Sequence, residues 1–254
     1  MKHAWARAAT AGWLGLIAVS LSPSLAADAR EPMPESRLFE RSLSVRRIPA
    51  KSPADTGGEI TCTYYPDLMI RESGTDTPDP EAAMLVVGAH PACTRNRPPG
   101  GVTLATEGYS LLGRMGGFVV FSATDPNGAV PFIVLDAASG RAIYTDGTVA
   151  NRGFRAAALD HGALHLRYTR GFNASCSLAQ DAGGCWAQLV KDGKIPPEMA
   201  GEVPPAPRCA AAYQKQHVPA DDPSVVFYDM ETTLNAGGAA RVLSHGAVGC
   251  EPMP

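Results

Sequence analysis

Hydrophobic runs near the middle of the 254-residue chain constrain its fold more than any other feature. Phe118–Ser122, Pro131–Asp136 and Arg141–Asp146 have the length and residue types of β-strands. The first two are hydrophobic at consecutive positions, so both of their faces need a cover. Between the last two, Asp136–Gly140 has the residues of a tight turn, because Asp bonds the backbone ahead and Gly supplies a positive φ. The runs predict a sheet that is buried from two sides.

The rest of the chain is also rich in strand and turn signals. It contains 26 Gly and 22 Pro, an excess that favours a turn-rich β protein over a helical bundle. Helical spacing occurs only late, in Cys185–Lys191 and Pro207–Gln216. Further strands are expected from Glu59 through Ile70, at Ala83–Ala89, in a hairpin of Phe154–Leu159 and Ala163–Arg170, and in a final hairpin of Val225–Leu234 and Ala239–Ser244.

These patterns predict a mainly β protein. Its antiparallel sheets would be sandwich-like or barrel-like, with a blade-like central hairpin and two short disulfide-pinned helices in the C-terminal third. Three regions follow along the chain: residues 1–26 as a signal peptide, residues 27–58 as a flexible lead-in with room for a strand at Ser42–Ile48, and residues 59–254 as a single β-rich domain.

The first 26 residues have the three-part layout of a secretory signal peptide. Lys2 and Arg7 give a positive start, a hydrophobic run follows from Ala8 to Leu21, and Ser24–Ala26 places small residues before a cleavage site. The run is about 14 residues long, shorter than the ~20 that a membrane-spanning helix needs. We therefore expect Sec-type export, cleavage near Ala26, a periplasmic or secreted location and no membrane attachment after cleavage.

All six cysteines follow the expected signal peptide, and an even number in an exported chain predicts three disulfides. Six cysteines allow fifteen pairings, and spacing alone does not choose among them. The best pair flanks a short Gly-containing loop, a second lies near the ends of neighbouring strands, and the third would tie down the C-terminus. These pairs are Cys176 with Cys185, Cys62 with Cys93, and Cys209 with Cys250. The absence of a C-x-x-C motif favours structural bridges over a redox or zinc role.

The sequence lacks the common local catalytic motifs, namely the G-x-S-x-G elbow, S-x-x-K, H-E-x-x-H, the P-loop and G-x-G-x-x-G. A net charge of -3 without a strongly basic block argues against nucleic-acid binding. We expect no cofactor, and we favour a protein that is not an enzyme.

Two groups of residues have partial metal-site character. His161 and His165, beside Asp160, are four positions apart, but the surrounding alternation favours a hairpin over the helix that would bring them to one face. A calcium site would have to use the turn residues Asp125, Asn127 and Asp136. These lack the full calcium-loop spacing and a bidentate Glu, so turn chemistry explains them. No metal site is expected.

The hairpin around residue 161 also contains basic residues that we interpret as an anion site, for a carboxylate, a phosphate or an acidic glycan. A three-residue turn at Asp160–Gly162 would place Arg155 opposite Arg167, and facing like charges need a neutralising partner. The alternatives are that the arginines pair with the chain's own acids, or that the turn has two residues. The candidate ligand-binding residues are Arg152, Arg155, His165, Arg167 and Arg170.

A family resemblance is carried by three segments, Ile60–Ile70, Pro91–Arg95 and Phe132–Tyr144. Together they resemble a group of uncharacterised exported proteins of proteobacteria, over most of the chain that follows the signal peptide. The resemblance implies no particular activity. Val134–Arg141 also looks like the last hairpin of a β-propeller blade, but the recurring copies that a propeller needs are absent from the sequence.

We therefore expect an exported protein with a non-catalytic binding or structural role. Its partner would be an envelope protein or an anionic small molecule or glycan. One alternative is an exported hydrolase whose site is built from dispersed His, Asp and Ser residues, which a deep pocket joining such groups would favour. Another is an inhibitor that presents His90–Gly101 to an exported enzyme, which a protruding, disulfide-anchored loop would favour.

Overall fold

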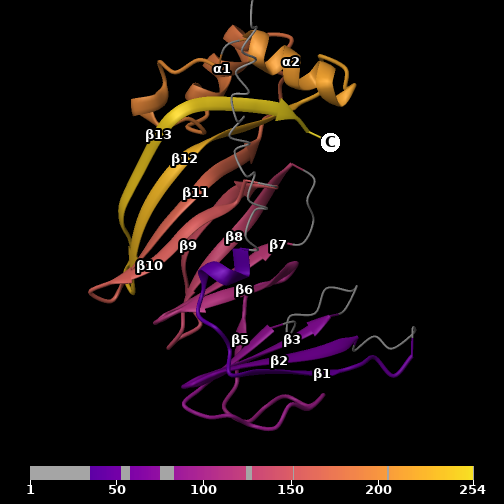
Figure 1. Cartoon of the computed structure of the whole chain (residues 1–254), viewed down its shortest axis with the longest axis vertical. Coiled ribbons are helices and arrows are strands. Elements are labelled where there is room, and N and C mark those ends of the chain that lie inside the picture. Colours follow the sequence, from indigo (N-terminus) through magenta and orange to yellow (C-terminus); the bar gives the residue numbers. More distant parts are fainter. Residues whose placement is uncertain are drawn as a thin grey trace, which may run out of the picture. The chain divides into compact units, whose positions relative to one another are not determined.

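The computed structural model describes residues 35–52, 58–74, 83–123, 128–150, 152–204 and 206–253. Within these ranges the chain forms two antiparallel sheets, two α-helices and two short 3-10 helices, which confirms the mainly β fold class (Figure 1). The expected signal peptide and the turn residues Asp125 and Asn127 lie outside the described residues. No helix in the described part of the chain is long and hydrophobic enough to cross a membrane.

The first sheet has five strands in chain order. They are β1 (Ser44–Ile48), β2 (Glu59–Tyr65), β3 (Leu68–Gly74), β4 (Ala83–Val87) and β5 (Val102–Leu104). The expectation of one strand from Glu59 through Ile70 is wrong. Pro66 and Asp67 form a tight turn, and Tyr65 pairs with Leu68 across it. Pro and Asp are typical turn residues, and here they interrupt an otherwise continuous strand pattern.

The second sheet contains eight strands. Seven of them follow the order β13-β12-β11-β9-β8-β7-β6, and the eighth, β10, lies outside this order and pairs with β11. The central strands and both later hairpins are confirmed. The strands are β6 (Tyr109–Met115), β7 (Phe118–Ala123), β8 (Ala129–Asp136), β9 (Ala142–Val149), β10 (Phe154–Asp160), β11 (Ala163–Asn173), β12 (Ser224–Asn235) and β13 (Gly238–Pro252).

Strands β7 and β8 are buried on both faces, as the sequence predicts. Val119 and Phe121 pack into a hydrophobic cluster with β3 and β4 of the first sheet. Phe118 and Val120 of β7 pack into a larger cluster with β10–β13 and the helices, and so do Phe132 and Val134 of β8. The second sheet curls, and β10 approaches β6: the space beside Gly116 is filled by Leu159.

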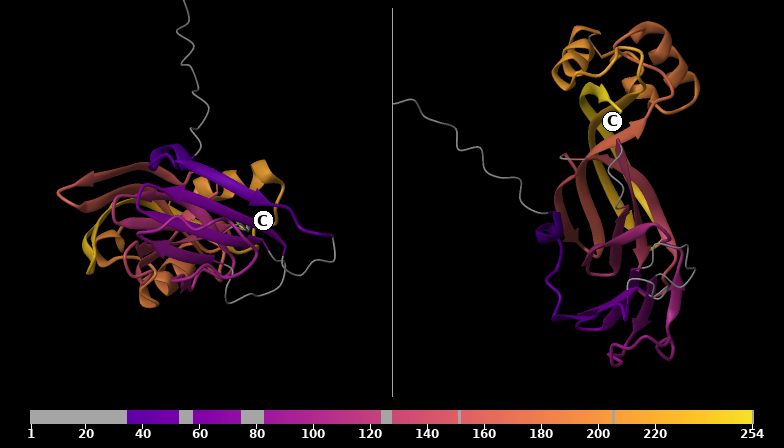
Figure 2. Two further views of the ribbon diagram at one scale, coloured as in Figure 1. Left: turned by 90° about the horizontal axis from the view of Figure 1, so that it is seen from below. Right: turned by 90° about the vertical axis from the view of Figure 1, so that its right-hand side faces the viewer.

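The two helices of the C-terminal third pack against the larger cluster. They are α1 (Ala182–Lys191) and α2 (Ala206–Gln216), with the 3-10 helix η2 (Pro197–Met199) between them. Both lie near the end of β13 that leads to the C-terminus (Figure 1, Figure 2). The Asp181 side chain caps α1 by accepting from the Gly184 N–H, and the Trp186 indole donates to the Ala200 carbonyl at 2.7 Å. These bonds satisfy polar groups at a helix end and inside the cluster.

All three expected disulfides are confirmed: Cys62–Cys93, Cys176–Cys185 and Cys209–Cys250. The last joins α2 to β13, and the second joins α1 to the segment after β11. The segment expected as a flexible lead-in contains the 3-10 helix η1 (Glu35–Leu38) and β1 in its described part. Phe39, just after η1, is 7% exposed and packs edge-to-face on Phe154.

Polar contacts join the two sheets. Glu72 on β3 accepts a hydrogen bond from the Leu111 N–H on β6 at 2.7 Å. Arg114 on β6 is buried, and it donates to Asp67 at 2.9 Å and to the Gly116 carbonyl at 2.8 Å. The turn between β2 and β3 is therefore held against the second sheet by a charged hydrogen bond in which Arg114 is buried and the Asp67 side chain is 60% exposed.

Glu72→Gln is expected to stabilise the protein at neutral pH. Burial is the largest influence on Glu72 and raises its pKa, although the Leu111 N–H lowers it. The folded state binds this proton more tightly than the unfolded chain, so the ionised carboxylate costs stability above the raised pKa. Gln removes the charge and keeps an acceptor for Leu111. Thermal unfolding should show a higher Tm at pH 7, with a gain that shrinks as pH falls and vanishes below about 4.3, the pKa of an exposed Glu.

The matched control is Glu59→Gln on β2. The Glu59 side chain is 48% exposed, so its neutralisation removes no burial cost and should give no comparable gain. A lower Tm for Glu72→Gln at pH 7 would contradict the argument.

Candidate functional site

The hairpin of β10 and β11 has a different register from the one expected. Its turn has two residues, His161 and Gly162, and Ala156 rather than Arg155 pairs with Arg167. The expected facing of Arg155 and Arg167 is therefore wrong. His161 and Gly162 have φ angles of 48° and 81°, the left-handed pair that a two-residue hairpin turn requires. An irregularity in the pairing follows Phe154, at the position of Arg155.

The arginines of this hairpin pair with acids of neighbouring strands. The Arg155 guanidinium lies 2.9 Å from the Asp229 carboxylate, and that of Arg167 lies 3.1 Å from Glu231. The remaining candidate residues also have partners: Arg152 with Glu251, Arg170 with Asp146, and His165 with the Thr233 hydroxyl. These contacts match the alternative in which the arginines pair with the chain's own acids. Alternation along β11 puts Arg170 on the opposite face from His165 and Arg167, so the five residues do not form one site.

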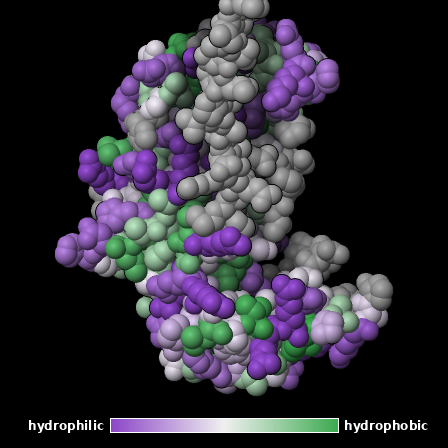
Figure 3. Space-filling model, viewed as in Figure 1, coloured by the Kyte–Doolittle hydropathy of each residue, from purple (hydrophilic) through white to green (hydrophobic). Residues whose placement is uncertain are grey.

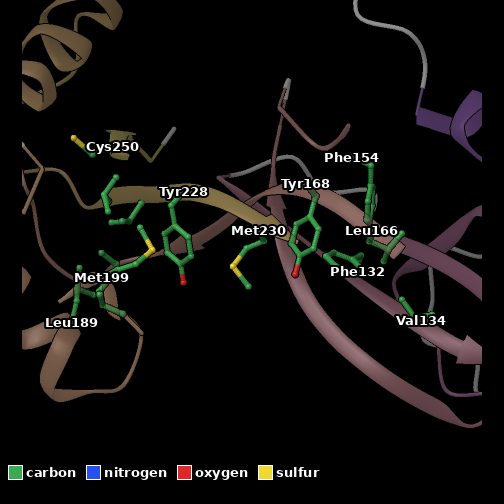
Figure 4. Close-up of a cluster of buried hydrophobic side chains, with 14 of the residues drawn as sticks. Phe132, Val134, Phe154, Leu166, Tyr168, Leu189, Met199, Tyr228, Met230 and Cys250 are labelled. Atoms are coloured by element: carbon green, nitrogen blue, oxygen red, sulfur yellow. The ribbon is translucent and has the colours of Figure 1, made fainter. Parts of the chain in front are cut away.

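Asp146 is the centre of a polar network on the inward face of β9, β11 and β12. Its carboxylate accepts from the Tyr168 hydroxyl at 2.6 Å, from Tyr144 at 3.1 Å and from the Arg170 Nε at 2.8 Å. Arg170 also donates to the Tyr228 hydroxyl. Figure 4 shows Tyr168 beside Phe132 and Tyr228 further along the same cluster of buried side chains. We call these five residues (Tyr144, Asp146, Tyr168, Arg170 and Tyr228) the Asp146 network.

The ionisation of the network fits a structural role. Burial, and then the negative charge of Asp146, raise the pKa of Tyr144 and of Tyr168, so both phenols remain protonated donors. Burial is the largest influence on Arg170 and lowers its pKa, but Asp146 and Tyr228 together outweigh burial and the net pKa is raised. The network thus holds one carboxylate and one guanidinium that satisfy each other inside the fold.

The histidines of the hairpin approach an acid without forming a metal site. His161 and His165 lie 3.5 Å and 3.9 Å from the Asp160 carboxylate. The His161 side chain is 96% exposed. Across the described ranges, no three or more His, Cys, Asp or Glu residues are grouped so that they could hold a metal ion.

A cleft of about 290 Å³ lies on the first sheet, between β1, β2 and the loop that follows β4. Ligand pockets commonly have volumes of roughly 300–1,000 Å³, so this cleft suits one small group or one or two side chains. Its lining contains two residues that can carry positive charge, Arg46 and His90, and no acid. We call it the basic cleft; its lining residues are Leu43, Ser44, Arg46, Tyr64, His90, Pro91 and Ala92.

The loop that forms one wall of the cleft, residues 88–101, is fixed to the sheet at several points. Cys93 bonds to Cys62 of β2, and the Tyr64 hydroxyl donates to the Pro91 carbonyl at 2.9 Å. The His90 ring packs edge-to-face on Tyr64, with centroids 5.8 Å apart. Buried Arg71 of β3 donates to the carbonyls of residues 94 and 95 at 3.2 Å and 2.8 Å. The cleft wall is therefore set before any ligand arrives.

The two segments that build most of the cleft are unusually basic. Residues 41–52 and 88–101 contain six Lys and Arg residues and no acid, in a chain whose net charge is -3. The Arg46 side chain is exposed and has no ion pair within the described residues, whereas Arg47 on the other face of β1 lies 3.8 Å from Glu59. The arginines of the β10–β11 hairpin are neutralised, and Arg46 is not.

Sequence reasoning did not find this cleft, although it singled out His90–Gly101 as a candidate inhibitor loop. A count of acids in the two segments is the signal that could have found it. No model of a known protein family matches the chain, and no curated protein sequence matches it either. The functional argument therefore rests on the geometry of the described residues.

Asp146→Asn tests the structural role of the Asp146 network. The Asp146 and Arg170 side chains are 8% and 27% exposed, so the variant leaves a mostly buried guanidinium without its counter-charge. We expect a loss of about 2–3 kcal/mol in the free energy of unfolding, measured by urea denaturation, somewhat below the ~3–5 kcal/mol of a fully buried pair.

The control for this prediction is Glu231→Gln, which removes the partner of Arg167 from a pair whose side chains are 61% and 42% exposed. Exposed pairs contribute about 0–1 kcal/mol. Equal losses for the two variants would show that burial does not distinguish them.

Proposed function

We propose that this protein is exported to an oxidising compartment and acts there as a non-catalytic binding protein whose ligand carries a negative charge. The observation that carries the proposal is the make-up of the basic cleft, in which Arg46 and His90 line the hollow and no acid does. A guanidinium can bind a carboxylate or a phosphate through two parallel hydrogen bonds.

The fixed walls of the cleft support a binding role. Ordering a loop when a ligand arrives costs affinity, and a loop that is already fixed avoids that cost. The Cys62–Cys93 disulfide and the Tyr64 and Arg71 hydrogen bonds hold the loop in place. Arg71 is only 7% exposed, so a buried charge is used to bond two loop carbonyls.

Export is supported by the three disulfides and by the sequence of residues 1–26. Disulfides form and persist in oxidising compartments such as the periplasm or the outside of the cell. The described cysteines are all paired, which suits structural bridges.

A hydrolase has less support. A catalytic Ser needs a base within hydrogen-bond reach. Ser44 and His90 both line the cleft, but no hydrogen bond joins them within the described ranges. The inhibitor alternative has one observation in its favour, because the 88–101 loop is exposed along most of its length and anchored by a disulfide.

The test is a titration of the full chain, after removal of any cleaved leader, with inorganic phosphate and with galacturonate, a sugar that bears a carboxylate. Amide and Arg side-chain NMR signals of residues 43–46, 64, 90 and 92 should shift together. Arg46→Gln should lower the affinity for both ligands by about tenfold. This corresponds to roughly 1.4 kcal/mol of binding free energy, which one charged hydrogen bond can supply.

Arg47→Gln is the matched control, because it removes the same charge from the next residue of β1 on the opposite face. It should leave both affinities nearly unchanged. The proposal is overturned if Arg46→Gln and Arg47→Gln weaken binding equally, or if the shifts are spread over the whole surface.

A further inference from the structure

Strand β1 is the end strand of the first sheet, and it forms one side of the basic cleft. It pairs with β2 along one edge. Among the described residues no strand pairs with its other edge. In an antiparallel pair, alternate residues direct their N–H and C=O groups away from the partner strand. The outer edge of β1 therefore offers backbone hydrogen bonds to an added strand.

The side chains of β1 differ between its two faces. Arg46 points to the face that carries the cleft, and Arg46 pairs across the sheet with Cys62, which anchors the 88–101 loop. Val45 lies on the opposite face by alternation and is 48% exposed. Leu43, just before the strand, is 63% exposed. An added strand would meet Arg46 and His90 on the face that carries the cleft, and Val45 and Arg47 on the opposite face.

The first sheet carries several exposed hydrophobic residues. In the described ranges eight large hydrophobic residues are exposed, and four of them belong to the first sheet or flank it: Leu43, Val45, Val87 and Val102. Figure 3 shows hydrophobic residues interspersed with hydrophilic ones over the part where Figure 1 places β1–β5. Isolated residues of this kind are common, but here two of them flank an unpaired backbone edge.

Charge decides between possible occupants of the edge. A second copy of this chain would bring Arg46 and Arg47 against the same residues, and like charges on facing strands are destabilising. An acidic segment would place carboxylates beside Arg46 and His90, where the lining has no acid of its own. The edge thus disfavours self-pairing and favours a negatively charged strand.

We infer that the partner at the basic cleft is an extended acidic segment of another protein, which adds to the free edge of β1. Its acidic side chains enter the cleft, and its alternate, hydrophobic side chains cover Val45 on the opposite face. This inference rests on the proposed function, because it names the source of the negative charge. Main-chain hydrogen bonds give affinity in this mode of recognition, and alternate side chains give specificity.

The experiment uses a blocked peptide of alternating Glu and Val, about as long as β1. Two further versions carry N-methyl groups, one on every Glu and one on every Val. Alternate N–H groups of a strand point to opposite edges, so only one version loses the N–H groups that face β1. We expect that version to bind about tenfold or more weakly, and the other to bind like the parent peptide. A peptide with the same residues in two blocks should also bind weakly.

Each outcome distinguishes this inference from the proposed function. Equal binding of both methylated peptides, with dependence on Arg46, overturns strand addition and leaves anion binding intact. Binding of phosphate without binding of the parent peptide does the same. If Arg46→Gln binds phosphate and the parent peptide as tightly as the unmodified protein does, both strand addition and anion binding at the cleft are overturned. A difference between the methylated peptides that disappears in Arg46→Glu, but not in Arg47→Glu, supports strand addition at this edge.

Discussion

Burial of β7 and β8 on both faces is the constraint on which the rest of the fold depends. Val119 and Phe121 belong to the cluster shared with the first sheet, and Phe118 and Val120 belong to the cluster shared with the curled half of the second. Each cluster includes side chains from this layer, so the layer links both halves. Removal of hydrophobic surface from water is the main favourable contribution to folding, and these strands contribute to it on two sides.

Features that depend on neighbouring residues were predictable from the sequence. The central strands, both late hairpins and the two helices follow from hydrophobic spacing and from Asp and Gly in turns. Features that depend on one residue of register were not. Pro66 and Asp67 separate β2 from β3, and the two-residue turn at His161 shifts Arg155 away from Arg167. One position reverses the face of every side chain in a strand, so a small error in a turn removes a site.

The basic cleft and the Asp146 network were beyond prediction for a different reason. Their members come from separate parts of the chain, as Arg46, Tyr64 and His90 show. Sheet pairing and a disulfide bring them together, and no short motif records either. The partners of the arginines are equally remote in sequence, since Arg155 and Asp229 lie on strands that are not adjacent in the chain. Predicting a site of this kind requires the topology first.

The order of the disulfides has a consequence for how the chain matures. The bridges join consecutive cysteines along the sequence, first with second, third with fourth and fifth with sixth. In a polypeptide that enters an oxidising compartment from its N-terminus, both cysteines of each pair emerge before the next cysteine does, so each native bond can form before a competing thiol is present. An oxidant with no selectivity would then produce the native bonds directly. Slow rearrangement of mispaired sulfurs, which takes minutes to hours without a catalyst, would be unnecessary.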